Sequence, residues 1–188
     1  MAFKFSWLNH ALPAATPILT SVVFALLMAA TLSSPIDDRA YLFAVTPRNS
    51  ASGYHLGVFG WCNDKGKNCS SRKVSYTING VMPDSFAVGC LLLHPITTAC
   101  AFFALVFSLL AIGMHKVSQI SLFLCFFVTV LAAETLIVDF LILSYFSEGS
   151  QANHGPGVNM VICAFILQAL ALLSSVICAF VGHSKRRT

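Results

Sequence analysis

Apolar residues along this chain gather into four long runs, and polar residues are concentrated between them. The runs cover about 12–36, 85–114, 118–146 and 157–181. Each is as long as the roughly 20 residues that an α-helix needs to cross a bilayer, or longer. The largest polar segment, 37–84, lies between the first two runs. The pattern predicts a single membrane domain over 1–188, with four transmembrane helices and one sizeable outer loop.

The first run has some features of a signal peptide. Lys4 gives it a basic start, and Ala29, Ala30 and Ser33 could form a small-residue cleavage site. However, the run is longer than the roughly 7–15 apolar residues of a signal peptide. We therefore interpret it as the first span.

Composition supports membrane residence. Of the 188 residues, 57% are hydrophobic and 10% are charged, and the mean hydropathy is +0.80. Soluble domains carry roughly 25% charged residues. The formal net charge of +4 does not indicate a nucleic-acid partner. The basic cluster Lys185, Arg186 and Arg187 is expected to anchor the fourth span at an anionic inner leaflet.

Lysine and arginine in the short segments predict the orientation. Lys4, Lys116 and the cluster after Lys185 fall on one side of a four-span layout, and the link after the third span has none. Short basic segments favour the cytoplasm, so both termini are predicted to be cytoplasmic. The basic residues of 37–84 argue for the opposite orientation, but the rule is weaker for longer loops.

The outer loop contains a possible β-hairpin. Tyr54 to Trp61 and Val74 to Ile78 are rich in strand-forming residues, and the polar run 63–68 between them favours a turn. Cys62 and Cys69 lie at the two ends of this turn and could form a stabilising disulfide or remain free thiols. An extracellular location favours the disulfide.

Asn68-Cys69-Ser70 also matches the N-glycosylation pattern, although a bridged Cys69 would crowd the acceptor Asn68. The other cysteines lie in apolar runs and are expected to be buried small residues; they are Cys90, Cys100, Cys125, Cys163 and Cys178.

Several motifs together resemble a known family. The outer-loop landmarks are Gly57-Val58-Phe59-Gly60-Trp61-Cys62, Cys69-Ser70 and Tyr76. The others are the run Leu91 to Ile96 with His94 and Pro95, then Asp139, then Gly155-Pro156-Gly157. In order and spacing this set resembles the fungal PalI family, which includes the Sur-type proteins of eisosome membrane domains. Those proteins are similar in layout to animal claudins.

The resemblance implies a claudin-like four-helix bundle with a small extracellular sheet, residence in the fungal plasma membrane and no enzymatic activity. Two features depart from the family pattern. Val74-Ser75-Tyr76 stands where a Leu-Gly-Tyr type sequence is usual. The sequence also ends six residues after Gly182, whereas PalI-type proteins often carry a long cytoplasmic tail. Signalling attributed to such a tail is therefore not carried over.

Polar residues inside the spans are candidate functional residues, because burying them in lipid is costly. They are His94, Glu134, Asp139 and Gln168. With a second span entering near Phe86, His94 and Asp139 would both lie roughly 10–12 Å below the outer boundary and could pair. Glu134 and Gln168 would both lie roughly 15–18 Å down and could form a hydrogen bond.

Two hypotheses exist for the pair of His94 and Asp139. It could be a titratable switch, because histidine changes charge near neutral pH. Alternatively, it could be a fixed interhelical hydrogen bond, which we favour.

Three functions are compatible with the sequence. The first is a membrane-domain organiser that associates laterally with itself or with lipids. The second is an accessory subunit of a larger membrane protein, such as a proton pump, wall synthase, transporter or ambient-pH receptor. The third is a pore, for which four spans offer little polar lining. Catalytic and phosphate-binding motifs are absent, and the histidines are scattered, so we expect no enzyme activity, cofactor or metal.

Overall fold

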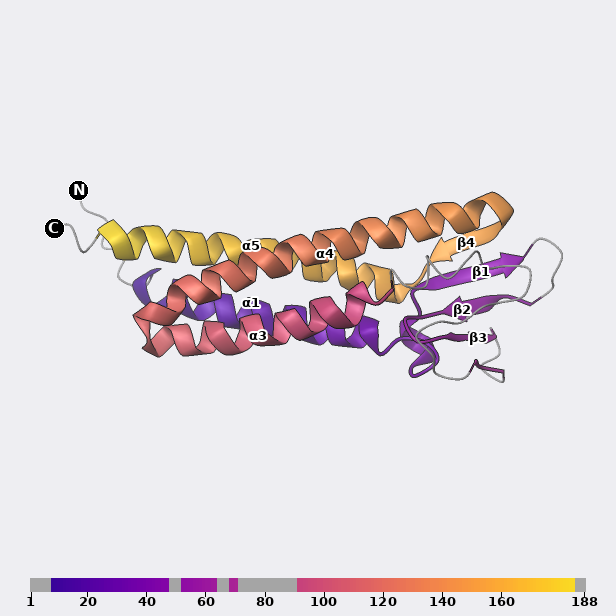
Figure 1. Cartoon of the computed structure of the whole chain (residues 1–188), viewed down its shortest axis with the longest axis horizontal. Helices are drawn as coiled ribbons and strands as arrows, with labels where there is room; N and C mark the ends of the chain where they lie inside the picture. Colours follow the sequence, from indigo (N-terminus) through magenta and orange to yellow (C-terminus); the bar gives the residue numbers. More distant parts are fainter. Residues whose placement is uncertain (1–7, 48–51, 64–67, 71–90, 185–188) are drawn as a thin grey trace.

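The described helices stand side by side as a bundle with a small sheet at one end (Figure 1). The computed structural model describes residues 8–47, 52–63, 68–70 and 91–184. The helices are α1 (Leu8–Thr31), α3 (Leu93–Gly113), α4 (His115–Gly149) and α5 (Pro156–Ser184). Among the described residues, these four are long and apolar enough to cross a membrane. The predicted four-span, mainly helical membrane fold is confirmed.

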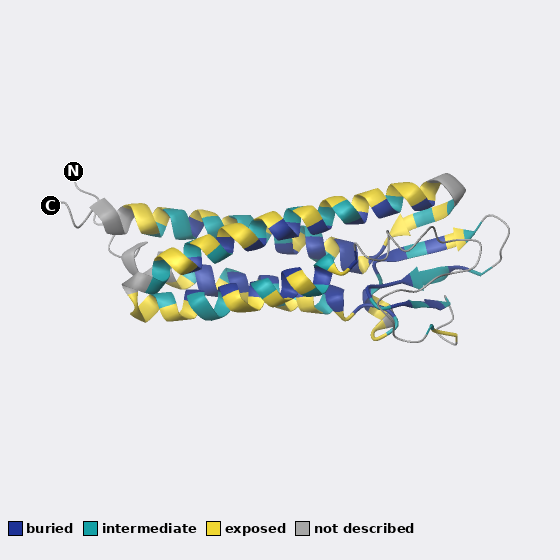
Figure 2. Cartoon of the chain, in the orientation of Figure 1, coloured by how far each residue is buried: buried dark blue, intermediate teal, exposed yellow. Residues whose placement is uncertain are grey.

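The helices pack as a ring in which each contacts two neighbours. Helix α1 lies against α3 and α5, and α4 lies against the same two helices from the other side. One hydrophobic cluster fills the middle of the ring; its members are Val23, Leu27, Ala101, Ala104, Val128 and Ala164. Small residues such as these alanines let helices approach closely in a membrane. Exposed positions line the outside of the bundle, where larger apolar side chains face the lipid (Figure 2).

The sheet is antiparallel and has the strand order β3-β2-β1-β4. Its strands are β1 (Phe43–Pro47), β2 (Tyr54–Leu56), β3 (Trp61–Asn63) and β4 (Ser150–His154). A short 3-10 helix, Asp38–Ala40, precedes β1. Strand β4 comes from the link between α4 and α5 and pairs with β1 over its full length. The sheet thus joins the two halves of the chain.

The sheet differs from the predicted hairpin in two respects. The segment Tyr54 to Trp61 was expected to be one strand, but it forms β2, a turn and the start of β3. The reason is local, because the backbone N–H of Gly57 donates to the carbonyl oxygen of Gly60 at 2.8 Å and turns the chain back on itself. Strands β1 and β4 were not predicted. The expected second strand, Val74 to Ile78, lies outside the described residues.

A second hydrophobic cluster joins the sheet to the bundle. Its buried members are Leu42, Phe43, Val45, Leu56, Val58, Leu91, Ile142, Phe146 and Val158. Gly155 lets the chain pass close to β1, because a Cβ there would overlap the Tyr41 ring and carbonyl oxygen. The N–H of Gly155 donates to the carbonyl oxygen of Leu42 at 2.6 Å. These contacts hold the sheet in a defined position on the helices.

Helix α3 begins later than the apolar run suggested. The run starts near residue 85, whereas α3 starts at Leu93, after a turn at Leu91 and Leu92. Pro95 is therefore the third residue of the helix, within the first turn, where its missing N–H is tolerated.

Candidate functional site

His94 and Asp139 meet in the buried interior of the bundle. The Nε2 atom of His94 and the Oδ1 atom of Asp139 are 3.0 Å apart, and both side chains are buried. The pair joins the first turn of α3 to α4. The other two polar atoms, His94 Nδ1 and Asp139 Oδ2, have no hydrogen-bond partner among the described residues. The structure thus brings these two residues together, as the sequence predicted.

The two helices give different levels for this pair. The predicted depth assumed that the second span enters near Phe86, but α3 begins at Leu93 and His94 is its second residue. On α4, Asp139 lies eight residues before the end of the candidate span at Ser147, about 12 Å along the axis. The depth of the pair stays a prediction.

Threonines extend the polar contacts by one helical turn. The hydroxyls of Thr97 and Thr135 are 3.0 Å apart and join α3 to α4. The hydroxyls of Thr31 and Thr98 are 2.8 Å apart and join α1 to α3. Thr98 also donates to the carbonyl oxygen of His94 at 2.8 Å. Together these contacts form a polar seam that links three helices below the sheet.

Sequence reasoning did not identify the threonine contacts between helices. A signal was available, because Thr97 and Thr98 follow His94 by one turn and Thr135 precedes Asp139 by one turn. Residues three or four apart lie on the same helix face. Hydroxyls placed in this way could have been assigned to the same interhelical surface.

The predicted hydrogen bond between Glu134 and Gln168 is wrong. Gln168 is buried and donates from Nε2 to the carbonyl oxygen of Cys125 at 3.1 Å, while its Oε1 has no partner among the described residues. Cys125 and Glu134 are nine residues apart on α4, about 13 Å along the helix axis. Gln168 is therefore at a different level from Glu134, and Glu134 is exposed on the outside of the bundle.

A small hydroxyl-lined cavity lies at the end of the bundle away from the sheet. All four helices contribute to its wall, and its volume is about 70 Å³. The Thr16 hydroxyl on α1 lies 3.3 Å from the Ser175 hydroxyl on α5. The polar lining residues are Thr16, Ser108, Ser118, Ser121, Ser175 and Cys178.

The glycine-rich signature forms the turn between β2 and β3 and docks it onto the end of α1. Gly57 has no room for a side chain, because a Cβ would overlap the backbone of Ser34. The next N–H, of Val58, donates to the Ser33 hydroxyl at 3.0 Å. Phe59 and Trp61 pack against the cluster that joins sheet and bundle. The signature is therefore a structural framework.

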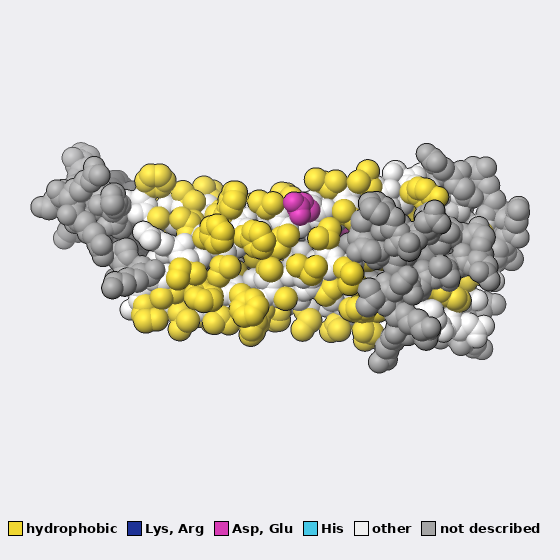
Figure 3. Space-filling view, in the orientation of Figure 1, with side chains coloured by type: hydrophobic (Ala, Val, Ile, Leu, Met, Phe, Trp, Pro, Cys, Tyr) yellow, Lys and Arg dark blue, Asp and Glu magenta, His cyan; other side chains and the backbone are white. Residues whose placement is uncertain are grey.

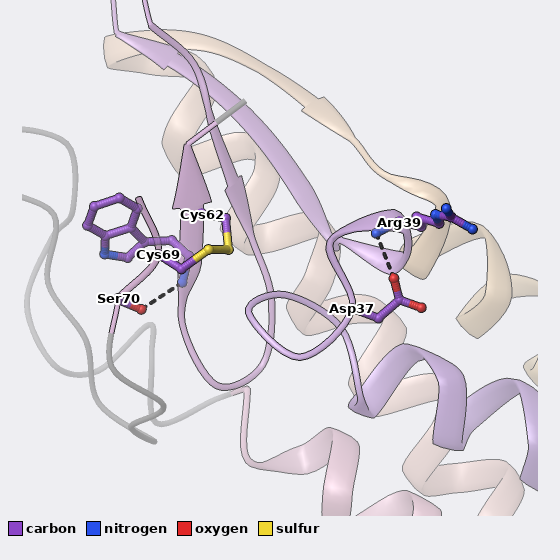
Figure 4. The surroundings of a disulfide bond; sticks show 6 residues. Asp37, Arg39, Cys62, Cys69 and Ser70 are labelled. Atoms are coloured by element: carbon purple, nitrogen blue, oxygen red, sulfur yellow. Dashed lines mark hydrogen bonds between the residues drawn. A yellow bond between two sulfur atoms is a disulfide. The ribbon is translucent and has the colours of Figure 1, made fainter. Parts of the chain in front are cut away.

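The predicted disulfide between Cys62 and Cys69 is present, and their Cα atoms are 4.0 Å apart (Figure 4). The two residues face each other as an antiparallel bridge beside β3. On one side of the bridge, the Trp61 N–H donates to the Ser70 hydroxyl at 3.0 Å and the Ser70 N–H donates to the Trp61 carbonyl oxygen at 2.8 Å. The disulfide thus closes a short, hydrogen-bonded ladder.

Asn68 is exposed next to this ladder, and its carbonyl oxygen accepts from the Asn63 N–H at 2.9 Å. The serine of its glycosylation pattern, Ser70, is engaged by Trp61. Glycosylation of Asn68 stays a prediction.

The remaining sequence-predicted residues divide into two groups. Tyr76 and the basic cluster Lys185, Arg186 and Arg187 lie outside the described residues. Of the cysteines predicted to be buried, Cys125 is buried, Cys100 and Cys178 are half-buried, and Cys163 is exposed on α5. Cys90 lies outside the described residues. No group of three or more His, Cys, Asp or Glu side chains in the described part of the chain could hold a metal ion.

Comparison with known proteins identifies the family. No curated protein matches the chain. The family model described as SUR7/PalI matches residues 10–178, a range that includes the signature turn, the disulfide, the polar seam and all four spans. Since this match covers most of the sequence, the chain belongs to the SUR7/PalI family.

Proposed function

We propose that this protein is a non-enzymatic organiser of a plasma-membrane domain in a fungal cell, and that it acts by lateral association. The observation that carries the proposal is that buried polar groups contact one another between helices of the same chain. His94 with Asp139, Thr97 with Thr135, and Thr31 with Thr98 join one helix to another. They hold the bundle together, which leaves the lipid-facing helices and the sheet as surfaces for other molecules.

The disulfide supports the proposed orientation. Disulfides form and persist in oxidising compartments, which supports an orientation with Cys62 and Cys69 outside the cell. The start of α1 and the end of α5 both lie at the opposite end of the bundle (Figure 1). In this orientation both termini are cytoplasmic, which agrees with the inner-leaflet anchor proposed for the basic cluster Lys185, Arg186 and Arg187.

The alternative function is an accessory subunit that stabilises or delivers a larger membrane protein, such as a proton pump, wall synthase, transporter or ambient-pH receptor. One observation favours it: Glu134 presents a carboxyl group on the lipid-facing side of α4. A partner helix with a hydrogen-bond donor could satisfy that group.

For the pair of His94 and Asp139 we propose a fixed structural role. Its neighbours Thr97 and Thr98 are also engaged between helices, so a change of charge would disturb several contacts at once. In this role the pair holds α3 against α4 and does not act as a switch.

Purification of tagged protein from native membranes in mild detergent, followed by cross-linking and mass measurement, tests the two functions. A ladder of homo-oligomers supports the organiser. One larger protein at fixed stoichiometry, without a ladder, supports the accessory subunit. Proton or ion flux across liposomes that contain only this protein would contradict both.

A further inference from the structure

Glu134 is an ionisable side chain on the lipid-facing surface of the bundle. Glu134 and Asp139 are the only Asp, Glu, Lys or Arg residues in the four candidate spans; Asp139 is buried and Glu134 is exposed. Figure 3 shows an acidic side chain surrounded by hydrophobic ones, well inside the apolar band. Within the described part of the chain, Glu134 has no hydrogen bond or ion pair. A carboxyl group in this position requires a partner, because hydrocarbon solvates neither its charge nor its hydrogen-bonding groups.

The direction of α4 makes it difficult for the Glu134 side chain to reach the membrane surface. Side chains of a helix lean toward its N-terminus, and α4 begins at the end of the bundle away from the sheet. The nearer end of the candidate span Val117–Ser147 is the sheet end, because Glu134 is about 20 Å from Ser147 and about 26 Å from Val117 along the axis. The side chain of Glu134 therefore leans away from the nearer surface and deeper into the apolar band.

Large apolar side chains continue the exposed face on both sides of Glu134. At spacings of three and four residues, Phe127, Val130, Ile137 and Leu141 are all exposed. This spacing makes a stripe along one face of the helix that can pack against another helix. Any bundle helix has such an outer face, so the stripe alone identifies no interface. The carboxyl group at its centre does, because lipid cannot satisfy it.

We propose that this stripe is the interface between two copies of the chain, with the two Glu134 carboxyls hydrogen-bonded to each other across a two-fold axis normal to the membrane. Copies inserted in the same orientation place equivalent residues of two α4 helices at the same depth. In each copy, Glu134 is the only carboxyl group of the described spans that faces the lipid, so it is the one that a second copy can contact. A protonated carboxyl is both donor and acceptor, so the group is complementary to itself. This inference rests on the proposed function, lateral association, and assigns it a surface.

Cysteine cross-linking tests the geometry directly. In a background with Cys90, Cys100, Cys125, Cys163 and Cys178 replaced by alanine and with Glu134, Cys62 and Cys69 kept, Leu141→Cys is compared with Phe140→Cys in liposomes under a mild oxidant. Leu141 lies in the stripe two turns from Glu134 and is 62% exposed, whereas Phe140 is 50% exposed but lies about 120° around the helix from Glu134. The proposal expects the Leu141→Cys variant to form covalent dimers at least tenfold faster. Equal rates would overturn it.

Glu134→Leu and Glu134→Gln test the chemistry. Leucine removes the hydrogen-bonding group, and we expect dimers measured by energy transfer between labelled copies in liposomes to weaken about threefold to thirtyfold, or about 0.6–2 kcal/mol at ~1.4 kcal/mol per tenfold. Glutamine keeps a donor and an acceptor and should retain most of the affinity. Wild-type affinity for Glu134→Leu would overturn the proposal.

The outcomes separate this inference from the proposed function. If homo-oligomers persist while Leu141→Cys fails to cross-link to itself, the chain associates through another surface, so the organiser function stands and the Glu134 interface is wrong. If wild-type protein forms no oligomers in native membranes or liposomes, both are wrong. If Leu141→Cys in native membranes cross-links only to a different protein, the inference is wrong and the accessory role gains support.

Discussion

Helix α4 carries two carboxylic acids, five residues apart, in opposite surroundings. Asp139 faces the interior and meets His94 at 3.0 Å. Glu134 lies about 140° around the helix, at 3.6 residues per turn, and is exposed on the outer face. The inner face of α4 also carries Thr135, which contacts Thr97, whereas the outer face carries Ile137 and Leu141.

The difference between the two faces shows how one helix can serve two purposes. An acid with a partner in its own chain contributes to the stability of the fold, and an acid without one is available for contact with another molecule. The stability of the isolated protein should therefore depend on the inner face. Its association should depend on the outer face.

The largest loss of stability is expected when the inner pair is broken. His94→Ala leaves the Asp139 carboxyl buried without its partner, and we expect the free energy of unfolding to fall by about 3 kcal/mol. Thermal unfolding of the purified protein in detergent and the amount that reaches the cell surface measure the effect. Asp139→Asn keeps an acceptor oxygen and should lose less. Wild-type stability and delivery for both variants would exclude a structural role for the pair.

Removing the disulfide should show whether the inner face depends on the outer sheet. Cys62→Ser opens the loop between two cysteines with a sequence separation of 7. The chain-entropy model gives a loss of about 2–3 kcal/mol in the free energy of unfolding. We expect faster hydrogen exchange in β2 and β3 with little change around Thr97 and Thr135. Cys163→Ser, at an exposed free cysteine, is the control and should behave like wild type. Equal exchange in both variants would mean that the bridge adds no stability.

A smaller effect is expected from the threonine contact. Thr97→Val removes one hydroxyl from the pair with Thr135, and interhelical hydrogen bonds in membranes average about 0.6 kcal/mol. A double-mutant cycle with Thr135→Val, read as unfolding free energies in detergent, isolates this interaction. A coupling energy indistinguishable from zero would show that the two hydroxyls do not stabilise the interface.

The smallest effect on the isolated protein is expected at the outer face. Glu134→Leu should leave the free energy of unfolding of monomeric protein in detergent within about 0.5 kcal/mol of wild type, or raise it slightly, because no contact within the chain is lost. Asp139→Leu is the matched variant and should be strongly destabilising. Similar losses for the two would show that the faces of α4 do not divide stability from association in this way.

Local features of the sequence predicted much of this molecule. Long apolar runs indicated four helical spans, because in lipid the backbone N–H and C=O groups must form hydrogen bonds within the segment, as they do in a helix. Cys62 and Cys69 could be paired because they flank a short polar turn in a loop that is predicted to be extracellular. His94 and Asp139 could be paired because both are costly to bury in lipid and were expected at similar depth. Each of these inferences needed only residue type, spacing along the chain and helix geometry.

Other features depend on which distant segments meet. Strand β4 begins at Ser150, directly after α4 ends at Gly149, and pairs with β1, which lies more than one hundred residues earlier in the chain. Short strands of this kind have weak local signals, and their pairing is set by the surface on which they pack. The start of α3 at Leu93 was missed for a similar reason, because the apolar residues before it extend the run without extending the helix.

By itself, the sequence determined that the chain crosses a membrane four times and that the ionisable side chains His94, Glu134 and Asp139, together with Gln168, fall inside those spans. Only the tertiary structure decided which of them meet. Gln168 contacts the backbone at Cys125, Asp139 contacts His94, and Glu134 faces outward. The physical reason is that composition sets the cost of placing a polar group in lipid, whereas helix rotation and level in the bundle decide whether a partner is within reach.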